Sequence, residues 1–152
     1  MPQNNLYEVI WETRRLFQCL ASKSNELLQP TGINASMRAV LEFLDKEEPQ
    51  TVPQMAHARN VSRQHIQNIV NELLDKDLVE VIENPAHKRS SLIQRTKTGV
   101  LCFADVKARE AKLFAEMSKS FSQQDLVITA QTLKTMRDYL NSDKCEALIS
   151  KI

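Results

Sequence analysis

The sequence predicts a mainly α-helical (α+β) fold that contains one two-stranded β-hairpin, and three observations lead to this class. Apolar side chains recur every three or four residues over most of the 152-residue chain, as they do along one face of a helix. Only two glycines occur, Gly32 and Gly99, which is too few for the many tight turns of a sandwich or barrel. Only one stretch, residues 78–95, combines β-branched residues and partial alternation with a central Asn-Pro turn.

Residues 6–28 predict a first helix whose apolar side chains form one broad stripe. Pro30 and Gly32 end this helix, and Asn34 is a suitable cap for a second one. The core face of the second helix is expected to consist of Met37, Val40, Leu41 and Leu44. The polar run 45–50 contains a proline and predicts a surface loop.

The next stretch predicts two short helices joined by a tight turn. Thr51 can cap the first, with Pro53 in its first turn, where a proline costs no backbone hydrogen bond. Asn60 suits the left-handed conformation that such turns require, and Ser62 can cap the following helix. The buried stripe of that helix is expected to be Ile66, Ile69, Val70, Leu73 and Leu74. This arrangement is typical of a helix-turn-helix, although other tight helical corners share the pattern.

A hairpin and two further helices complete the expected fold. Residues 78–83 and 90–95 predict two strands around a turn at 84–89, and a hairpin directly after a helix-turn-helix is a wing. A long helix follows Gly99. Ser122 can cap a last helix, with inward side chains expected at Leu126, Ala130, Leu133, Met136 and Leu140. The C-terminal tail is apolar and is expected to pack against a partner surface through Leu148, Ile149 and Ile152.

The charge is distributed unevenly, although the net charge is only +1. Residues 85–97 carry four basic side chains and no acidic one, whereas residues 71–83 carry five acidic side chains against one lysine. The local charges are therefore +4 and −4. Positive charge is concentrated where a wing would meet phosphates, which favours nucleic-acid binding over the alternative of a merely solvated hairpin.

Together these features make the chain resemble the MarR family of winged-helix transcriptional regulators over nearly its whole length. The resemblance is carried by residues 51–56 leading into Leu73, by 78–81, by the wing 84–89 and by 95–99. Arg89 matches the family's wing arginine, but His87 stands where aspartate is usual and Arg95 where leucine is usual. The first departure puts in doubt the salt bridge that normally braces the wing arginine.

The resemblance implies a homodimer that binds a pseudo-palindromic operator in double-stranded DNA. It implies a single domain over 1–152, with a winged helix-turn-helix lobe at 34–97 and dimerisation helices at 1–30 and 98–152. The apolar stripe of the first helix and the apolar tail exceed what a small winged core can bury, which independently favours a twofold interface.

The expected DNA-contacting residues lie on the second motif helix and on the wing. Four amides, Gln64, Gln67, Asn68 and Asn71, point away from the apolar face of that helix, and amides can read the adenine edge. Arg63 can reach a guanine or a phosphate, while Ser62 can act as a cap or as a base reader. On the wing, Arg89 is expected to enter the minor groove and Lys88 to contact a phosphate.

An effector pocket for a small lipophilic or aromatic acid is expected between the helices. Its apolar lining would be Phe17, Leu20, Met37, Val40, Leu41, Phe103 and Val106, and the nearby cations Arg14, Arg15 and Arg38 suit a carboxylate. The alternative is that these apolar residues are ordinary core and that the arginines are solvated.

Other function classes find little support. His57 and His65 lack further ligands at metal-binding spacing, so no metal site and no cofactor are expected. No enzyme signature occurs, and Cys19 is expected to be a buried structural cysteine. Residues 1–5 do not resemble a signal peptide and no run is long enough to span a membrane, which favours a cytoplasmic protein. Two alternatives remain open, a winged-helix module that binds proteins and no DNA, and a redox switch at Cys19.

Overall fold

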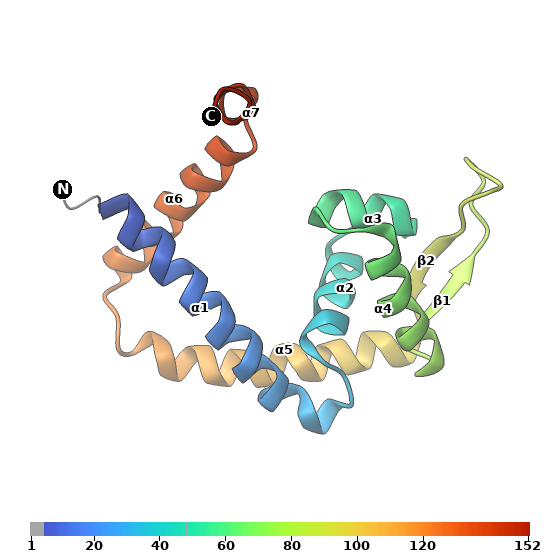
Figure 1. Ribbon diagram of the computed structural model, residues 1–152. Helices are drawn as coiled ribbons and strands as arrows, with labels where there is room; N and C mark the ends of the chain where they lie inside the picture. The colour runs from blue at the N-terminus through green and yellow to red at the C-terminus, as the bar shows by residue number, and fades with distance from the viewer. Residues whose placement is uncertain (1–4, 48) are drawn as a thin grey trace. The chain divides into compact units, whose positions relative to one another are not determined.

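A computed structural model describes residues 5–47 and 49–152 (Figure 1). The elements in chain order are α1 (Asn5–Leu28), η1 (Gln29–Thr31), α2 (Ala35–Lys46), α3 (Val52–Arg59), α4 (Arg63–Asp75), β1 (Val79–Ile82), β2 (Leu92–Arg95), α5 (Lys97–Ser118), α6 (Gln123–Leu140) and α7 (Asp143–Ile149). This confirms the mainly helical class with one small sheet. Two compact units meet within α5, one ending at Glu110 and the other comprising Ala111–Ile152. The sequence predicts no signal peptide at residues 1–5. Residues 1–4 of this stretch lie outside the residues that the structure describes.

Side-chain caps fix where the helices begin, as the sequence predicted. The Met37 amide donates to Asn34 Oδ1 at 2.9 Å, and the His65 amide donates to Ser62 Oγ at 3.1 Å. Thr51 forms a reciprocal capping box with the side chain of Gln54. Between α3 and α4, Asn60 adopts the left-handed conformation with φ 52°, which allows the tight turn of a helix-turn-helix.

The core of the first unit lies where α2, α3, α4, the hairpin and the first half of α5 pack together. Its fully buried side chains include Val40, Leu41, Met55, Ile66, Val70, Leu73, Val79, Phe103 and Val106. The predicted stripe of α4 is therefore confirmed, except that Leu74 is only partly buried. Gly99 is required at the start of α5 because a Cβ there would lie 1.9 Å from the Leu78 carbonyl oxygen.

The wing is an antiparallel hairpin in which Val79 pairs with Arg95 and Ile82 with Leu92. The chain just before α3 adds a short third edge, because Gln50 and Ile93 exchange backbone hydrogen bonds of 3.2 and 2.8 Å. These bonds attach the base of the wing to the segment that connects α2 with α3. The wing is thus held at its base by the backbone as well as by apolar contacts.

Three sequence expectations need correction. The loop expected at 45–50 is shorter, because α2 continues through Lys46; Glu48 lies outside the described residues. The apolar tail is partly the helix α7, which begins at the cap residue Ser142. The inward side chains expected on α6 are not buried, and in residues 111–152 only Cys145 is buried.

Candidate nucleic-acid interface

The outer face of α4 presents the four amides in two hydrogen-bonded pairs. Gln64 Nε2 donates to Asn68 Oδ1 at 2.8 Å, and Gln67 Nε2 donates to Asn71 Oδ1 at 2.9 Å. Each pair spans one helical turn, so the two pairs run along the helix side by side. Each glutamine keeps its carbonyl oxygen and each asparagine its amino group for a further partner. The pairs therefore present donors and acceptors in fixed directions, and the exposed carboxylates Glu72 and Asp75 follow one turn beyond Asn68 and Asn71.

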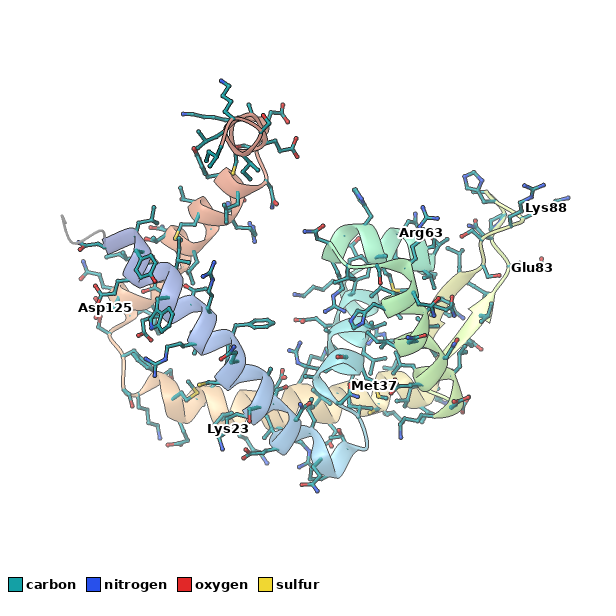
Figure 2. All side chains as sticks on the ribbon, in the orientation of Figure 1. Lys23, Met37, Arg63, Glu83, Lys88 and Asp125 are labelled. Atoms are coloured by element: carbon teal, nitrogen blue, oxygen red, sulfur yellow. The ribbon has the colours of Figure 1, made fainter. Side chains whose placement is uncertain are left out.

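Arg63 is exposed in the first turn of α4, and Figure 2 shows it and Lys88 at the beginning of α4 and at the hairpin tip. Ser62, directly before Arg63, uses its Oγ to accept the His65 amide. The structure therefore shows Ser62 in its capping role, while its contact with a base stays a prediction. Positive charge next to the partly positive N-terminus of α4 makes this end of the helix attractive to an anion.

A cleft of about 500 Å³ lies between α4, the start of α3 and the wing. Its walls bring together two sets of residues that were predicted separately, Arg63, Gln64 and Gln67 from α4 and Arg89 with two serines from the wing. The floor is apolar, formed by Val52, Pro53, Val81 and Ile93. One concave surface thus joins the amide face to the wing arginine, while Asn68, Asn71 and Lys88 lie outside its lining.

The wing turn is built around Asn84, for which the sequence pattern predicted no role beyond membership of the turn. Its Oδ1 accepts the Ala86 amide at 3.0 Å, and its Nδ2 donates to the Ser90 carbonyl at 2.8 Å. Lys88 and Arg89 are exposed on this turn. Across residues 5–47 and 49–152, neither forms an ion pair with a carboxylate, so the salt bridge questioned because of His87 is indeed missing.

Arg95 does not contribute to the exposed charge of the wing, which corrects the +4 estimate. Its Nη1 lies 2.8 Å from Asp45 Oδ1, and its side chain is only 16% exposed. The exposed charge of segment 85–97 is therefore smaller and lies on Lys88, Arg89 and Lys97. Sequence reasoning missed this pair because it assigned Asp45 to a loop.

The residues expected to bind an effector are placed in two different settings. Met37, Leu41 and Phe103 are buried in one core cluster, whereas Arg14 and Phe17 are exposed on α1. Arg38 already holds two carboxylates, because its Nε and Nη2 donate to Glu110 and its Nη1 donates to Glu42. The effector site stays a prediction, and these contacts favour the alternative of a core with paired arginines.

These ion pairs shift the pKa values of Arg38 and Glu42. The hydrogen bond to Glu110, reinforced by Glu42, raises the pKa of Arg38 further above its ordinary value, although burial opposes the shift. Burial would raise the pKa of Glu42, but the hydrogen bond and charge of Arg38 lower it overall. Arg38 and Glu42 therefore stay charged throughout the physiological range, and Arg38 joins α2 to α5 through Glu110.

The remaining reactive side chains have simple settings. His57 and His65 are exposed, and within the described residues no three His, Cys, Asp or Glu side chains gather as a metal site would need. Cys19 is exposed, which corrects the expectation that it is buried. Burial raises the pKa of the Cys102 thiol, which makes it less reactive.

No helix in the described parts is long and apolar enough to cross a membrane.

Comparisons with known proteins agree with this architecture. Residues 31–90 match the family model described as MarR family. An uncharacterized protein of Mycobacterium tuberculosis is 25% identical over 125 residues, covering 82% of this chain and 87% of the relative. A crystal structure of a MarR family transcription regulator is 26% identical with a TM-score of 0.82, covering 90% of this chain and 91% of the other.

Two further solved structures include bound molecules. A mutant of MarR from E. coli complexed with operator DNA is 20% identical with a TM-score of 0.78, covering 90% of this chain and 98% of the other. MarR of Staphylococcus aureus in complex with salicylate and kanamycin is 17% identical with a TM-score of 0.80, covering 90% and 93%. At these identities the two structures establish a shared fold.

Proposed function

This chain is a MarR-family winged-helix protein, and from that premise we propose that it is a sequence-specific repressor that binds a pseudo-palindromic operator as a homodimer and is released by a small ligand. MarR-family regulators are non-enzymatic DNA-binding proteins, and we expect no catalytic activity from this chain. The related E. coli protein in complex with operator DNA supports a DNA partner.

The observation that carries the proposal is the cleft that joins the amide face of α4 to the wing. In the major groove, the paired amides offer the donor and acceptor that an adenine edge needs, and Arg63 offers two donors to a guanine or a charge to a phosphate. Arg89 forms no ion pair within the described residues, and a narrow minor groove attracts its positive charge. Base reading therefore belongs to α4, and the wing supplies electrostatic attraction.

The dimer is supported by apolar surface that one chain leaves exposed. Trp11 and Leu16 on α1 are 50% and 53% exposed, and Leu140 and Ile149 near the C-terminus are 63% and 66% exposed. Large apolar side chains exposed in such numbers mark an interface between proteins. A twofold axis would place two copies of α4 in successive major grooves, one helical turn of DNA apart, which requires a pseudo-palindromic site.

A mobility-shift assay with genomic fragments around the protein's own gene tests the proposal. We expect one fragment to bind far more tightly than random DNA at the same salt concentration, and its affinity to fall steeply as salt rises. Arg89→Ala should lower the slope of log affinity against log salt by about 1, whereas the exposed Lys23→Ala on α1 should not. Absence of DNA binding would instead favour the winged-helix module that binds proteins, and equal binding on all fragments would contradict sequence specificity.

A second candidate, a thiol-responsive regulator on the same scaffold, is favoured by the exposure of Cys19. Peroxide should then release DNA from the wild type and not from Cys19→Ser. Equal release from both proteins, or none from either, would remove this candidate.

The ligand response rests on the resemblance and on the relative in complex with salicylate. Titrating salicylate-like acids into the protein–operator complex tests it, with Arg38→Ala as the variant in which the effect of the acid should change. No change in DNA affinity or melting temperature up to millimolar acid would leave a repressor without this effector class.

A further inference from the structure

Asp45, in the last turn of α2, joins three elements through the two oxygens of one carboxylate. Its Oδ1 lies 2.8 Å from Arg95 Nη1 at the end of β2, and its Oδ2 lies 3.0 Å from Lys107 Nζ on α5. The side chains of Asp45 and Arg95 are 27% and 16% exposed, so this pair is largely shielded from water. Lys107 Nζ also lies 5.1 Å from the centre of the Phe103 ring, which fixes its position further.

This carboxylate acts at the base of the wing, where the hairpin meets the lobe. Two residues before Arg95, Ile93 pairs with Gln50, so β2 is also held by backbone hydrogen bonds to the connection after α2. In the part of the chain that the structure describes, the tip has no comparable attachment to the lobe, because Arg89 pairs with no carboxylate there. The direction of the wing therefore depends on its base.

We propose that Asp45 is a positioning residue for DNA binding, which holds β2 through Arg95 and so sets the direction in which the wing presents Lys88 and Arg89. The proposal rests on the proposed function. Asp45 itself contacts no DNA in this account. Removing its charge leaves a mostly buried guanidinium without a partner, and such a group moves toward water at the expense of the packing around it.

The sign of the effect separates positioning from simple electrostatics. A carboxylate near a DNA-binding surface repels phosphates, so its removal should strengthen DNA binding if charge were its only contribution. A positioning role predicts the opposite, because the wing loses its direction. Glu47, two residues later, provides a matched control, since it is exposed and forms no ion pair within the described residues.

The test compares Asp45→Asn with Glu47→Gln in the full-length protein, by operator affinity and by amide hydrogen exchange of residues 84–95 in the absence of DNA. We expect Asp45→Asn to weaken operator binding about fivefold or more and to speed exchange in the wing. Glu47→Gln should leave exchange unchanged and affinity equal or slightly higher. Asp45→Glu, which keeps the charge, should restore most of the affinity.

A second variant guards against a general loss of folding. Arg95→Gln removes the link to β2 but leaves Asp45 bonded to Lys107, and it should speed wing exchange in the same way. The double variant should exchange no faster than the faster single variant, because both break one contact. Unchanged exchange in both single variants, or tighter DNA binding by Asp45→Asn, would overturn the proposal. If the wild type binds no operator, the proposed function fails, while the exchange measurement still decides whether Asp45 holds the wing.

Discussion

Helices α4 and α6 share almost the same local sequence signals but differ in what covers them. Each begins at a serine whose Oγ accepts a backbone amide, from His65 at 3.1 Å in α4 and from Asp125 at 3.0 Å in α6. Each carries apolar residues at helical spacing. The stripe of α4 is buried, with Ile66 and Leu73 at 0% exposure, whereas α6 buries no residue.

The difference shows that apolar residues at helical spacing identify which face of a helix is to be buried. They do not show whether the same chain or a second chain covers that face. The neighbours of α4 are α2, α3 and β1, all within its own unit. Within its unit α6 contacts α7, and of residues 111–152 only Cys145, on α7, is buried. A stripe that a single chain leaves bare is a candidate for an interface, which is how we interpret α6.

The largest effect is expected from a substitution in α4, the helix whose apolar stripe is buried. Leu73→Ala should lower the free energy of unfolding by about 2–5 kcal/mol, because it leaves a cavity in a closed core. The loss should be the same at low and high protein concentration. Denaturant titrations at two concentrations measure it, with Leu133→Ala on α6 as the counterpart. If the proposed dimer forms through α6, the loss of unfolding free energy caused by Leu133→Ala should depend on protein concentration. An equal loss from both variants at every concentration would mean that both apolar stripes are buried within a single chain.

A carboxylate on the exposed stripe should disrupt assembly and leave the first unit folded. Leu133→Glu should weaken dimerisation about a hundredfold, since burying a charge without a partner costs several kcal/mol. Light scattering at micromolar concentration should then give the mass of a monomer. Gln131→Glu, on the opposite face of α6, is the control and should stay dimeric. A dimer that survives Leu133→Glu would place the interface elsewhere.

Substitutions on the outer faces of α4 and α6 should differ in their effect on DNA binding. Gln67→Ala on α4 should cost about 1–3 kcal/mol of operator affinity, and the loss should be confined to operators with an A·T pair at the contacted position. Lys134→Ala on the polar side of α6 should have no effect on any DNA. Affinities for a set of single-base operator variants separate the two. A loss that is uniform across all sequences would show that Gln67 does not read bases.

The smallest expected effect is a change in the hydrogen exchange of the wing at acidic pH, and it is confined to the first unit. A hydrogen bond from Lys107, together with the charge of Arg95, lowers the pKa of Asp45. A lowered pKa in the folded state gives stability that is fully present above the ordinary value of about 3.9 and is lost as the pH falls through the folded value. Wing exchange, corrected for its intrinsic pH dependence, should therefore be steady from pH 8 to 5 and rise only in stronger acid. Asp45→Asn should remove this acid dependence; a rise already near neutral pH would point to another group.

Local signals account for what the sequence predicted correctly. The caps at Asn34, Thr51 and Ser62 and the left-handed Asn60 depend on backbone groups within a few residues, so the pattern alone locates them. The errors about charge and burial involve partners far along the chain. Asp45 was assigned to a loop because the run 45–50 is polar and contains a proline, and its pairing with Arg95 and Lys107 on other elements was missed, which inflated the charge of the wing.

The candidate site follows the same division. The outward direction of the amides follows from 100° per residue, but their pairing into Gln64–Asn68 and Gln67–Asn71 depends on side-chain rotamers that the period does not determine. The cleft arises only when α4 and the wing are placed together. The exposure of Cys19 likewise depends on what packs against α1, which the sequence of α1 does not reveal.

The four outward amides of α4 are uncharged side chains, which has a consequence for the kinetics of DNA binding. Long-range attraction would come from Arg63 and the wing, so the association rate should fall with salt and be nearly the same for every DNA sequence. The amides act only at contact distance, so they should slow departure from a matching site without speeding arrival. Such a protein would encounter all DNA equally often and would distinguish its operator by how long it stays bound.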